Sequence, residues 1–357
     1  MRLIKENSPY IFKDSSVKRM MLDVLIALIP VVIYSIIQFG LGAVSVLAIS
    51  IVTMVILELL FVFLNNKPSY NGEKISLKEW IKNAKNKATI NNIITPIISA
   101  VIYAMIMPAY TNWYIVLIGA ISGIVLGKLL FGGLGGNIFN PAAVGRVVTM
   151  VCFADRIVYP NVNPLFGVDS FVGGTPLGVL ANDINVINGD AIKNLFIGTV
   201  SGSMGEVSKM CILLGAIYLI VRRSADFRVM LSMVLSFAFV MLFAGIKVND
   251  NAFMYMLYQV LSGGLLFGAI FMATDPVTSP TTRPGRITFG ILIGVISALI
   301  RLIGAYPEGV AFAILIVNMF VPVIDYYKFS TNKYNYKHFV LWGVILALAI
   351  IIVIFGL

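Results

Sequence analysis

The amino-acid sequence predicts an all-α, polytopic membrane protein. Hydrophobic residues make up 59% of its 357 positions and charged residues only 12%, whereas soluble domains carry about 25% charged residues. The mean hydropathy is +0.95. The net charge of +10 does not indicate nucleic-acid binding, because the basic residues lie in short loops between apolar spans, a pattern that orients membrane proteins.

About ten core transmembrane helices and one extra C-terminal helix are expected, since a helix needs roughly 20 apolar residues to cross the bilayer core. The first five spans are expected at about 20–38, 43–64, 92–108, 113–131 and 141–153. The next five are expected at about 206–221, 229–246, 253–272, 286–303 and 308–325, and the extra helix at 338–356. Five spans on each side of the longest polar segment suggest an inverted 5+5 repeat, an arrangement common in transport folds.

The polar segments divide the chain into five regions with a predicted orientation. These are a cytoplasmic lead at 1–19, a first transmembrane half at 20–153, an extracytoplasmic loop at 154–205, a second transmembrane half at 206–325, and a cytoplasmic loop plus the extra helix at 326–357. Every cluster of lysine and arginine falls in a loop that this topology places inside. Because positive charge marks cytoplasmic loops, the N-terminus is expected in the cytoplasm.

Few groups with metal or acid–base chemistry are present. The two cysteines and the single histidine form no metal-ligand spacing, so neither a metal site nor a catalytic residue is assigned. The charged residues of the spans lie within a turn or two of the span ends, where long side chains can reach the interface. We therefore expect interfacial positions for Asp23, Glu58, Lys128, Arg301, Glu308 and Asp325.

The long polar segment contains a threonine in an unusual setting. Gly173 and Gly174 precede Thr175, and Pro176 follows it. Glycine permits close backbone approach, and proline pushes the preceding residue towards an extended conformation. These residues predict a hydroxyl exposed on a loop, although a plain turn between two helices would have the same composition.

Two further polar segments interrupt the apolar pattern. The first combines several glycines with Asn137, Asn140 and Arg146, a set suited to bind an anion or a ring at a half-helix start. The second holds Thr274 and Asp275 among three prolines, which suits a re-entrant loop lining a polar site. A simpler interpretation remains open for each segment. The first would be a site of close helix packing with an asparagine cap, and the second a basic cytoplasmic connector.

Several strings in the chain resemble one family of membrane proteins. They are Ser8-Pro-Tyr10, the apolar run from Met20 to Pro30, Asn140-Pro-Ala-Ala-Val-Gly-Arg146, Gly174-Thr-Pro-Leu177, Ala273-Thr-Asp-Pro-Val-Thr-Ser-Pro280, Gly309-Val-Ala-Phe-Ala313 and Val321-Pro-Val-Ile-Asp-Tyr-Tyr327. The family contains the D subunits of Rnf complexes, the ion-translocating ferredoxin:NAD⁺ oxidoreductases, and more distantly the B subunits of sodium-pumping NADH:quinone oxidoreductases. The extra C-terminal span departs from many members, which end before it.

The resemblance implies that Thr175 carries FMN through a phosphoester to its hydroxyl, made by a separate FAD-dependent flavin transferase. The family's attachment pattern is Asp, two variable residues, Ser or Thr, Gly, Ala, Thr. Asp169, Gly173 and Thr175 match this pattern, whereas Val172 and Gly174 depart from it. A second, non-covalent flavin such as riboflavin, or a quinone-like ligand, is the hypothesis for the two other polar segments.

The function implied by the resemblance is electron relay. The chain would be one subunit of a hetero-oligomeric complex in the cytoplasmic membrane of a bacterium or archaeon, and not a complete enzyme alone. It would relay electrons between ferredoxin-side and NAD-side subunits, coupled to Na⁺ or H⁺ translocation. Two alternatives stay open: a passive channel of the urea or ammonium type, and a quinone-reducing relative similar to the B subunit of the sodium pump.

Overall fold

The computed structural model describes residues 17–66, 77–87, 89–162, 168–170, 174–248, 251–304, 309–326 and 332–356. The first part of the chain is helical. It consists of α1 (Val17–Phe39), α2 (Leu41–Asn65), α3 (Leu77–Lys87), α4 (Asn91–Met105), α5 (Trp113–Gly127), the short 3₁₀ turn η1 (Leu129–Phe131) and α6 (Pro141–Cys152).

The second part of the chain is again a set of apolar helices. These are α9 (Lys209–Val221), α10 (Phe227–Val248), α11 (Ala252–Leu261), α12 (Leu265–Phe267) running into the π-helical turn η4 (Gly268–Met272), α13 (Arg283–Ile303), α14 (Val310–Ile324) and α15 (Tyr336–Gly356). The α11 and α12–η4 pieces are bent by 60° relative to each other. A break of this kind at membrane depth requires protein around it, because no water is present to satisfy the freed backbone groups.

The segment between the two halves contains more regular structure than the loop expected at 154–205. It holds η2 (Ala154–Arg156), a short antiparallel pair of β1 (Asn161–Val162) and β2 (Val168–Ser170), α7 (Pro176–Asn182), η3 (Ile184–Val186) and α8 (Gly189–Ile197). Local capping explains both helices. Thr175 and Asn188 accept hydrogen bonds from the first turns of α7 and α8, and Gly198 ends α8 at φ 109°.

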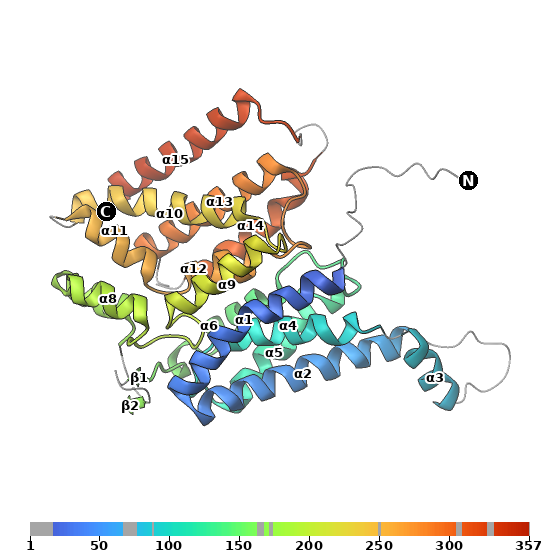
Figure 1. Ribbon diagram of the computed structural model, residues 1–357. Coiled ribbons are helices and arrows are strands. Elements are labelled where there is room, and N and C mark those ends of the chain that lie inside the picture. The colour runs from blue at the N-terminus through green and yellow to red at the C-terminus, as the bar shows by residue number, and fades with distance from the viewer. Residues whose placement is uncertain are drawn as a thin grey trace.

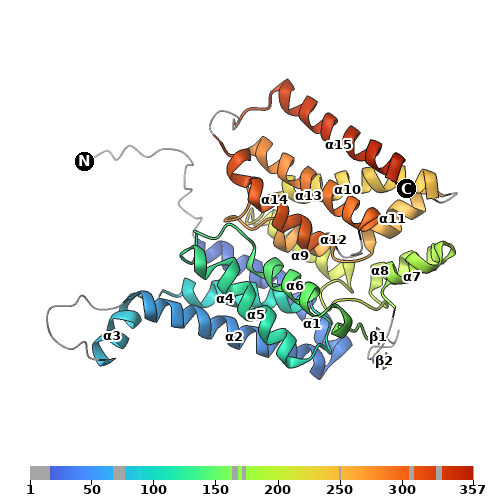
Figure 2. The ribbon, with the colours of Figure 1, turned by 180° about the vertical axis from the view of Figure 1, so that it is seen from behind.

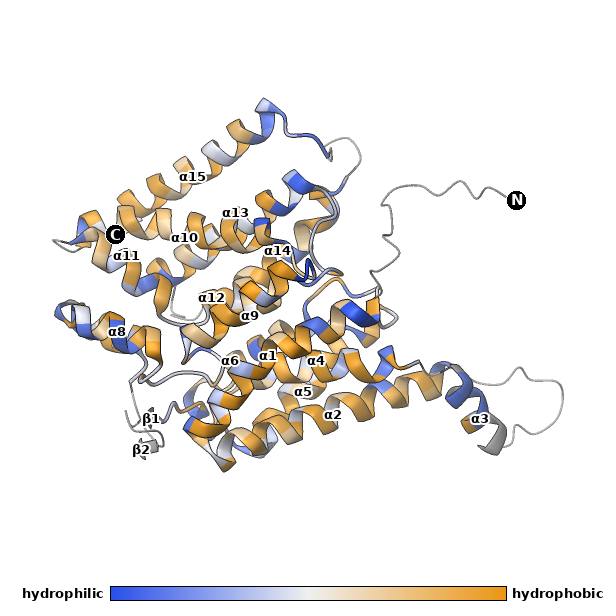
Figure 3. Cartoon of the chain, in the orientation of Figure 1, coloured by the Kyte–Doolittle hydropathy of each residue, from blue (hydrophilic) through white to orange (hydrophobic). Residues whose placement is uncertain are grey.

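The helices account for the expected spans. Six described helices are long and apolar enough to cross a membrane, the bent α11–η4 pair would make a seventh, and α4, α6, α9 and α14 are shorter apolar helices. Apolar residues cover most of these helices, while α3 and α8 are markedly more polar (Figure 3). The all-α, polytopic membrane class predicted from the sequence is therefore confirmed; the inverted relation of the two halves stays a prediction.

The two halves form adjoining layers. Helices α1–α6 lie together, α10–α15 lie together above them, and α9 lies beside α1 (Figure 1). The reverse view shows α6 facing α14, a second contact between the halves (Figure 2). The α7–α8 region and the C-terminal end of α15 lie at one end, while α3 and the start of α1 lie at the other. This agrees with the predicted topology, although the side of the membrane that each end faces stays a prediction.

Helices α10 and α13 pack closely against each other, and this packing depends on two glycines. A Cβ atom on Gly290 or Gly294 would collide with the hydroxyl of Ser232 or Ser236, respectively. Without side chains at these positions the two backbones approach closely, as in other small-residue contacts between membrane helices. The Ser236 hydroxyl also lies 3.4 Å from the Ile291 carbonyl and donates to it across this contact.

Replacing Gly294 by valine should force α10 and α13 apart. We expect a loss of about 1–3 kcal/mol of folding stability, the usual cost of overpacking a core, measured as a lower thermal unfolding midpoint of the detergent-purified protein. Gly343→Val in α15 is the matched control, because nothing lies within 4 Å of a Cβ atom at that position. Equal midpoints for the two variants would contradict this account of the contact.

Candidate functional site

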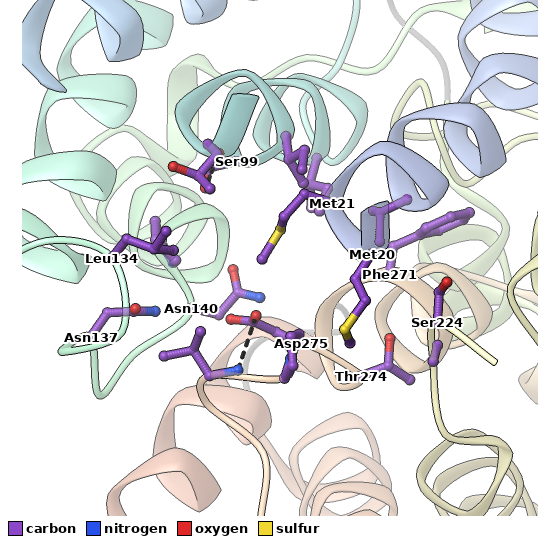
Figure 4. A pocket seen from close by; sticks show the side chains of 18 of the residues that line it. Met20, Met21, Ser99, Leu134, Asn137, Asn140, Ser224, Phe271, Thr274 and Asp275 are labelled. Carbon is purple, nitrogen blue, oxygen red and sulfur yellow. Dashed lines mark hydrogen bonds between the residues drawn. The ribbon is translucent and has the colours of Figure 1, made fainter. Parts of the chain in front are cut away.

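Two of the polar segments meet in one internal cavity, here called the amide pocket. It has a volume of about 70 Å³ and lies between the starts of α1 and α4, the connection before α6 and the connection after η4. Asn137, Asn140 and Asp275 are directed towards one another there, and Met20 and Met21 lie on its other side (Figure 4). Thr274 also lines the pocket. The structure thus brings together four of the site residues that the sequence singled out.

Asn140 is the structural centre of the amide pocket. Its Oδ1 atom accepts hydrogen bonds from the N–H groups of Ala142 (3.0 Å) and Ala143 (3.4 Å), so it caps the N-terminus of α6. Its Nδ2 atom donates to the Met272 carbonyl at 3.1 Å. That carbonyl ends the π-helical turn, where the regular hydrogen-bond ladder stops. One buried amide therefore satisfies both broken elements.

Asn137 and Asp275 offer the groups that a ligand would contact. Asn137 is 7% exposed, and within the described residues its Oδ1 atom has no hydrogen-bond partner. Desolvation raises the pKa of the Asp275 carboxyl, although the Val277 N–H and the Thr278 hydroxyl donate to it. A buried acceptor without a donor is costly, so the pocket suits a ligand that brings an N–H or O–H group.

Arg146 does not belong to the amide pocket. It lies six residues after Asn140 on α6, which corresponds to about 9 Å along a helix, and it is absent from the pocket lining. Its buried guanidinium donates to the Tyr159 hydroxyl at 2.8 Å and lies 3.5 Å from the Met107 sulfur. The predicted anion-binding set is thus divided, because Arg146 contacts Tyr159 and Met107 and does not line the amide pocket.

Thr175 is the N-cap of α7 and not a free loop residue. Its backbone is extended, with φ −65° and ψ 152°, as expected for a residue before proline, and its Oγ1 atom accepts a hydrogen bond from Gly178 N–H at 3.2 Å. The side chain is partly exposed and Gly174 is exposed. Gly173 lies outside the described residues, and Asp169 is described only as part of the β2 backbone. A hydroxyl with a fixed lone pair remains open to the exterior.

A small cavity beside Thr175 contains two buried charged residues that the sequence analysis did not single out. Its volume is about 10 Å³, and Glu206 and Lys209 contribute to its lining. Lys209 is 2% exposed, and its ammonium group donates to the Glu206 carbonyl and lies 3.5 Å from that of Gly263. Lys209 lies in the first turn of α9, and no motif in the sequence distinguishes it from the other lysines near helix ends.

The interfacial positions expected for the charged residues are wrong for Glu58 and Lys128. Both side chains are buried, and their Nζ and Oε1 atoms form an ion pair at 3.0 Å between η1 and α2. Lys128 also donates to the Thr95 hydroxyl at 2.8 Å. The sequence placed each residue near a span end; the end of α5 lies against α2 and α4, so neither side chain reaches water.

Asp23 is also buried, so the prediction of an interfacial position is wrong for this residue as well. It accepts hydrogen bonds from Tyr218, Arg222 and Ser224, and so ties α1 to the end of α9.

The other charged residues show mixed outcomes. Partly exposed Arg301 donates to the Gln259 carbonyl at 2.6 Å and lies over the Phe237 ring, so it packs inside the second half. Asp325 accepts from Thr281 N–H at 2.9 Å and holds the connection before α13. Glu308 lies outside the described residues. Within the described ranges, no group of three or more metal-ligating side chains is present.

These features define a polytopic membrane protein with a polar site built from interrupted helices. Comparison with known proteins shows which family it comes from. The sequence model of the NQR2, RnfD, RnfE family matches residues 4–335. The chain belongs to this family, and the resemblance stated from its motifs is confirmed.

The relatives fall into two groups. The D subunit of the proton-translocating ferredoxin:NAD⁺ oxidoreductase complex of Clostridium ljungdahlii is 32% identical over 343 residues, covering 92% of this chain and 96% of the relative. The D subunit of the ion-translocating oxidoreductase complex of Actinobacillus succinogenes is 31% identical, covering 90% and 95%. The B subunit of the Na⁺-translocating NADH-quinone reductase of Chromohalobacter salexigens is 37% identical, covering 66% and 58%. All three are subunits of ion-translocating oxidoreductases, the class predicted from the sequence.

Replacing Lys128 by methionine should strongly destabilise the protein. The Glu58 carboxylate would remain buried without its counter-ion, which costs about 3–5 kcal/mol, and the thermal unfolding midpoint should fall accordingly. The double variant Glu58→Gln, Lys128→Met should recover most of this loss. Lys193→Met, at an exposed position in α8, is the control; a double variant as unstable as the single one would contradict the proposed coupling.

Proposed function

We propose that this chain is an FMN-carrying subunit of an ion-translocating ferredoxin:NAD⁺ oxidoreductase and relays electrons between neighbouring subunits of that complex. The observation that carries the proposal is the Thr175 hydroxyl, partly exposed at the start of α7, in a chain that aligns over nine-tenths of its length with the D subunits of such complexes. FMN would supply the redox chemistry, and the protein would supply its position and surroundings.

The surroundings of Thr175 fit an attached phosphoester. The Gly178 N–H already points to Oγ1, and an ester oxygen can still accept that bond. Glu206 and Lys209 both line the adjoining cavity, so their opposite charges place no net negative charge beside the phosphate. Gly174 is exposed, and a Cβ atom there would lie only 3.0 Å from the Val179 side chain of α7, so glycine lets the chain approach the helix closely beside Thr175. The flavin transferase would therefore find an accessible hydroxyl whose orientation the helix cap fixes.

The flavin ring would lie outside the cavity beside Thr175. A cavity of about 10 Å³ is far below the roughly 300–1,000 Å³ of typical ligand sites. A ring held at the surface by a covalent bond faces whatever neighbouring protein covers this end of the molecule. Relay between subunits is therefore a better account of Thr175 than a reaction enclosed within this chain.

The amide pocket is the second candidate cofactor site. Its unpaired Asn137 oxygen and the Asp275 carboxyl suit the imide edge of a non-covalent flavin such as riboflavin, or a quinone-like ring. At about 70 Å³ the pocket is smaller than such a ring requires. Binding would need Met20 and Met21 to move, and methionine is the most adaptable of the apolar side chains.

A passive channel remains the competing class of function, and colour separates the two. A flavoprotein absorbs visible light and a channel does not. In the relay proposal, coupling to Na⁺ or H⁺ movement would be a property of the assembled complex. Other subunits of the complex would determine whether the coupling ion is Na⁺ or H⁺.

Replacing Thr175 by asparagine should abolish flavin attachment while preserving the fold. Asparagine caps a helix as well as threonine does, but it has no hydroxyl to form the ester. Mass spectrometry of the tryptic peptide, from protein produced with its flavin transferase, should show FMN less water in the wild type and none in Thr175→Asn. Thr175→Ser keeps the hydroxyl and should retain attachment.

Thr199→Ala, in the same interhelical region, is the control for attachment and should not change the peptide that contains Thr175. An unmodified Thr175 in a complex that still transfers electrons would sink the proposal. The channel interpretation would then be the one to pursue, through transport assays in vesicles.

Replacing Asn137 by alanine should weaken any non-covalent flavin in the amide pocket. The loss of one amide hydrogen bond predicts a three- to tenfold lower affinity, from about 0.5–1.5 kcal/mol, measured as acid-extractable flavin per purified complex. The covalent FMN on Thr175 should be unchanged. Asn66→Ala, at the end of α2, is the matched control, and a wild-type complex without extractable flavin would refute this part.

A further inference from the structure

A second polar cavity lies beside the amide pocket and is lined by arginines. It has a volume of about 470 Å³ and lies at the junction of α9, α10 and α13. Arg223, Arg228 and Arg286 line it together with a single carboxylate, Asp226. We call these four residues the arginine vestibule. None of them was part of the predicted cofactor site.

The arginine vestibule carries an excess of positive charge. Asp226 is shared, since it pairs with Arg228 at 3.1 Å and with Arg286 at 2.5 Å. Three guanidinium groups against one carboxylate leave a net charge of +2. Arg223 is exposed, and within the described ranges it forms no ion pair. The N-terminus of α10 at Phe227 adds its positive dipole end. The vestibule is therefore built for an anion.

An apolar groove continues from the arginine vestibule. Phe227 and Arg228 line both cavities, and the groove has a volume of about 440 Å³ between α10, α13 and α15. Its floor follows one ridge of α10, with Leu231, Leu235 and Phe239 at successive intervals of four residues. Leu235 is 64% exposed. From Phe227 to Phe239 the ridge measures about 18 Å, close to half of the roughly 30 Å hydrocarbon core.

We propose that the vestibule and the groove together bind one anionic phospholipid. The phosphate headgroup would be held by Arg223 and Arg228, since guanidinium groups bind phosphate with strong, charge-assisted hydrogen bonds. One acyl chain would follow the Leu231–Phe239 ridge through the depth of one leaflet. Basic pockets between membrane helices are established headgroup sites on membrane proteins generally.

The apolar groove is what favours a lipid over a nucleotide. The vestibule and the amide pocket share Met20, Ser224 and Thr274 in their linings, so the phosphate of a nucleotide in the amide pocket is the other anion within reach. Such a ligand has no apolar chain to place against Leu235. An anionic lipid would occupy both the arginine-lined cavity and the apolar groove, whereas a nucleotide would leave the groove empty.

Native mass spectrometry of the detergent-purified full chain tests the proposal by titration with defined lipids. Dioleoyl-phosphatidylglycerol should bind one molecule per chain more tightly than dioleoyl-phosphatidylcholine. The double variant Arg223→Gln, Arg228→Gln should weaken phosphatidylglycerol binding about thirtyfold, at about fivefold per arginine. Arg283→Gln, an exposed arginine at the same end but outside both cavities, should leave it unchanged.

The groove is tested separately with Leu235→Trp, which fills it from an exposed position. This variant should weaken binding of the dioleoyl lipid but not of dihexanoyl-phosphatidylglycerol, whose chains are too short to follow the ridge. Equal affinities for the anionic and zwitterionic lipids would overturn the proposal. The proposal would also be overturned if FMN competed with phosphatidylglycerol, and if this competition were lost in the arginine variants but kept in Leu235→Trp. The anion site would then belong to a nucleotide.

Discussion

The constraint that organises this molecule is that a polar group within the bilayer has no water to bind and is costly unless it finds a partner inside the protein. Asn140 shows how much one residue can satisfy. Its side chain caps α6 and donates to the last carbonyl of the π-helical turn. The side chain of Asn318 in α14 adds a further contact: its NH₂ group donates to the Ile314 carbonyl, and its oxygen accepts from the Asn140 backbone N–H at 3.2 Å. Both halves of the chain meet at this residue, so interrupted helices from each half can face a shared pocket without leaving broken hydrogen bonds exposed to lipid.

The same constraint explains where the buried charges lie. Glu58 and Lys128 neutralise each other where α5 ends against α2, and Asp23 is surrounded by donors from the end of α9. Each of these interactions joins helices that are distant in sequence, so each can form only once those helices have packed together. Buried ion pairs contribute little net stability compared with apolar replacements, but they penalise any arrangement that separates the partners. They specify which helices are neighbours.

The sequence predicted the membrane class and the eleven apolar elements, and it singled out four of the polar residues that line the amide pocket, because hydropathy and Gly-Pro interruptions are local signals. It did not predict burial of Glu58 or Lys128, since distance from a span end says nothing about whether a neighbouring helix covers that end. Arg146 was grouped with Asn140 by proximity in sequence, but the rise of α6 carries it away. The capped helix after Thr175 follows from the Thr-Pro pair, although the surrounding loop composition obscured it. A single sequence does not show which helices, distant along the chain, lie against each other in the fold.

The positions of the two candidate sites bear on how a relay through this chain could work. The amide pocket is internal and lies near the start of α1, whereas Thr175 lies at the α7–α8 end, so the length of the helices separates them. A flavin attached to Thr175, as proposed, would lie at the surface, and its next electron-transfer partner would have to come from another protein. Met20 and Met21, which line the amide pocket at the start of α1, would instead have to move before a ring could enter it. In the proposed function the helical core would hold one polar site near the start of α1, and the interhelical segment would present Thr175 at the other end of the molecule.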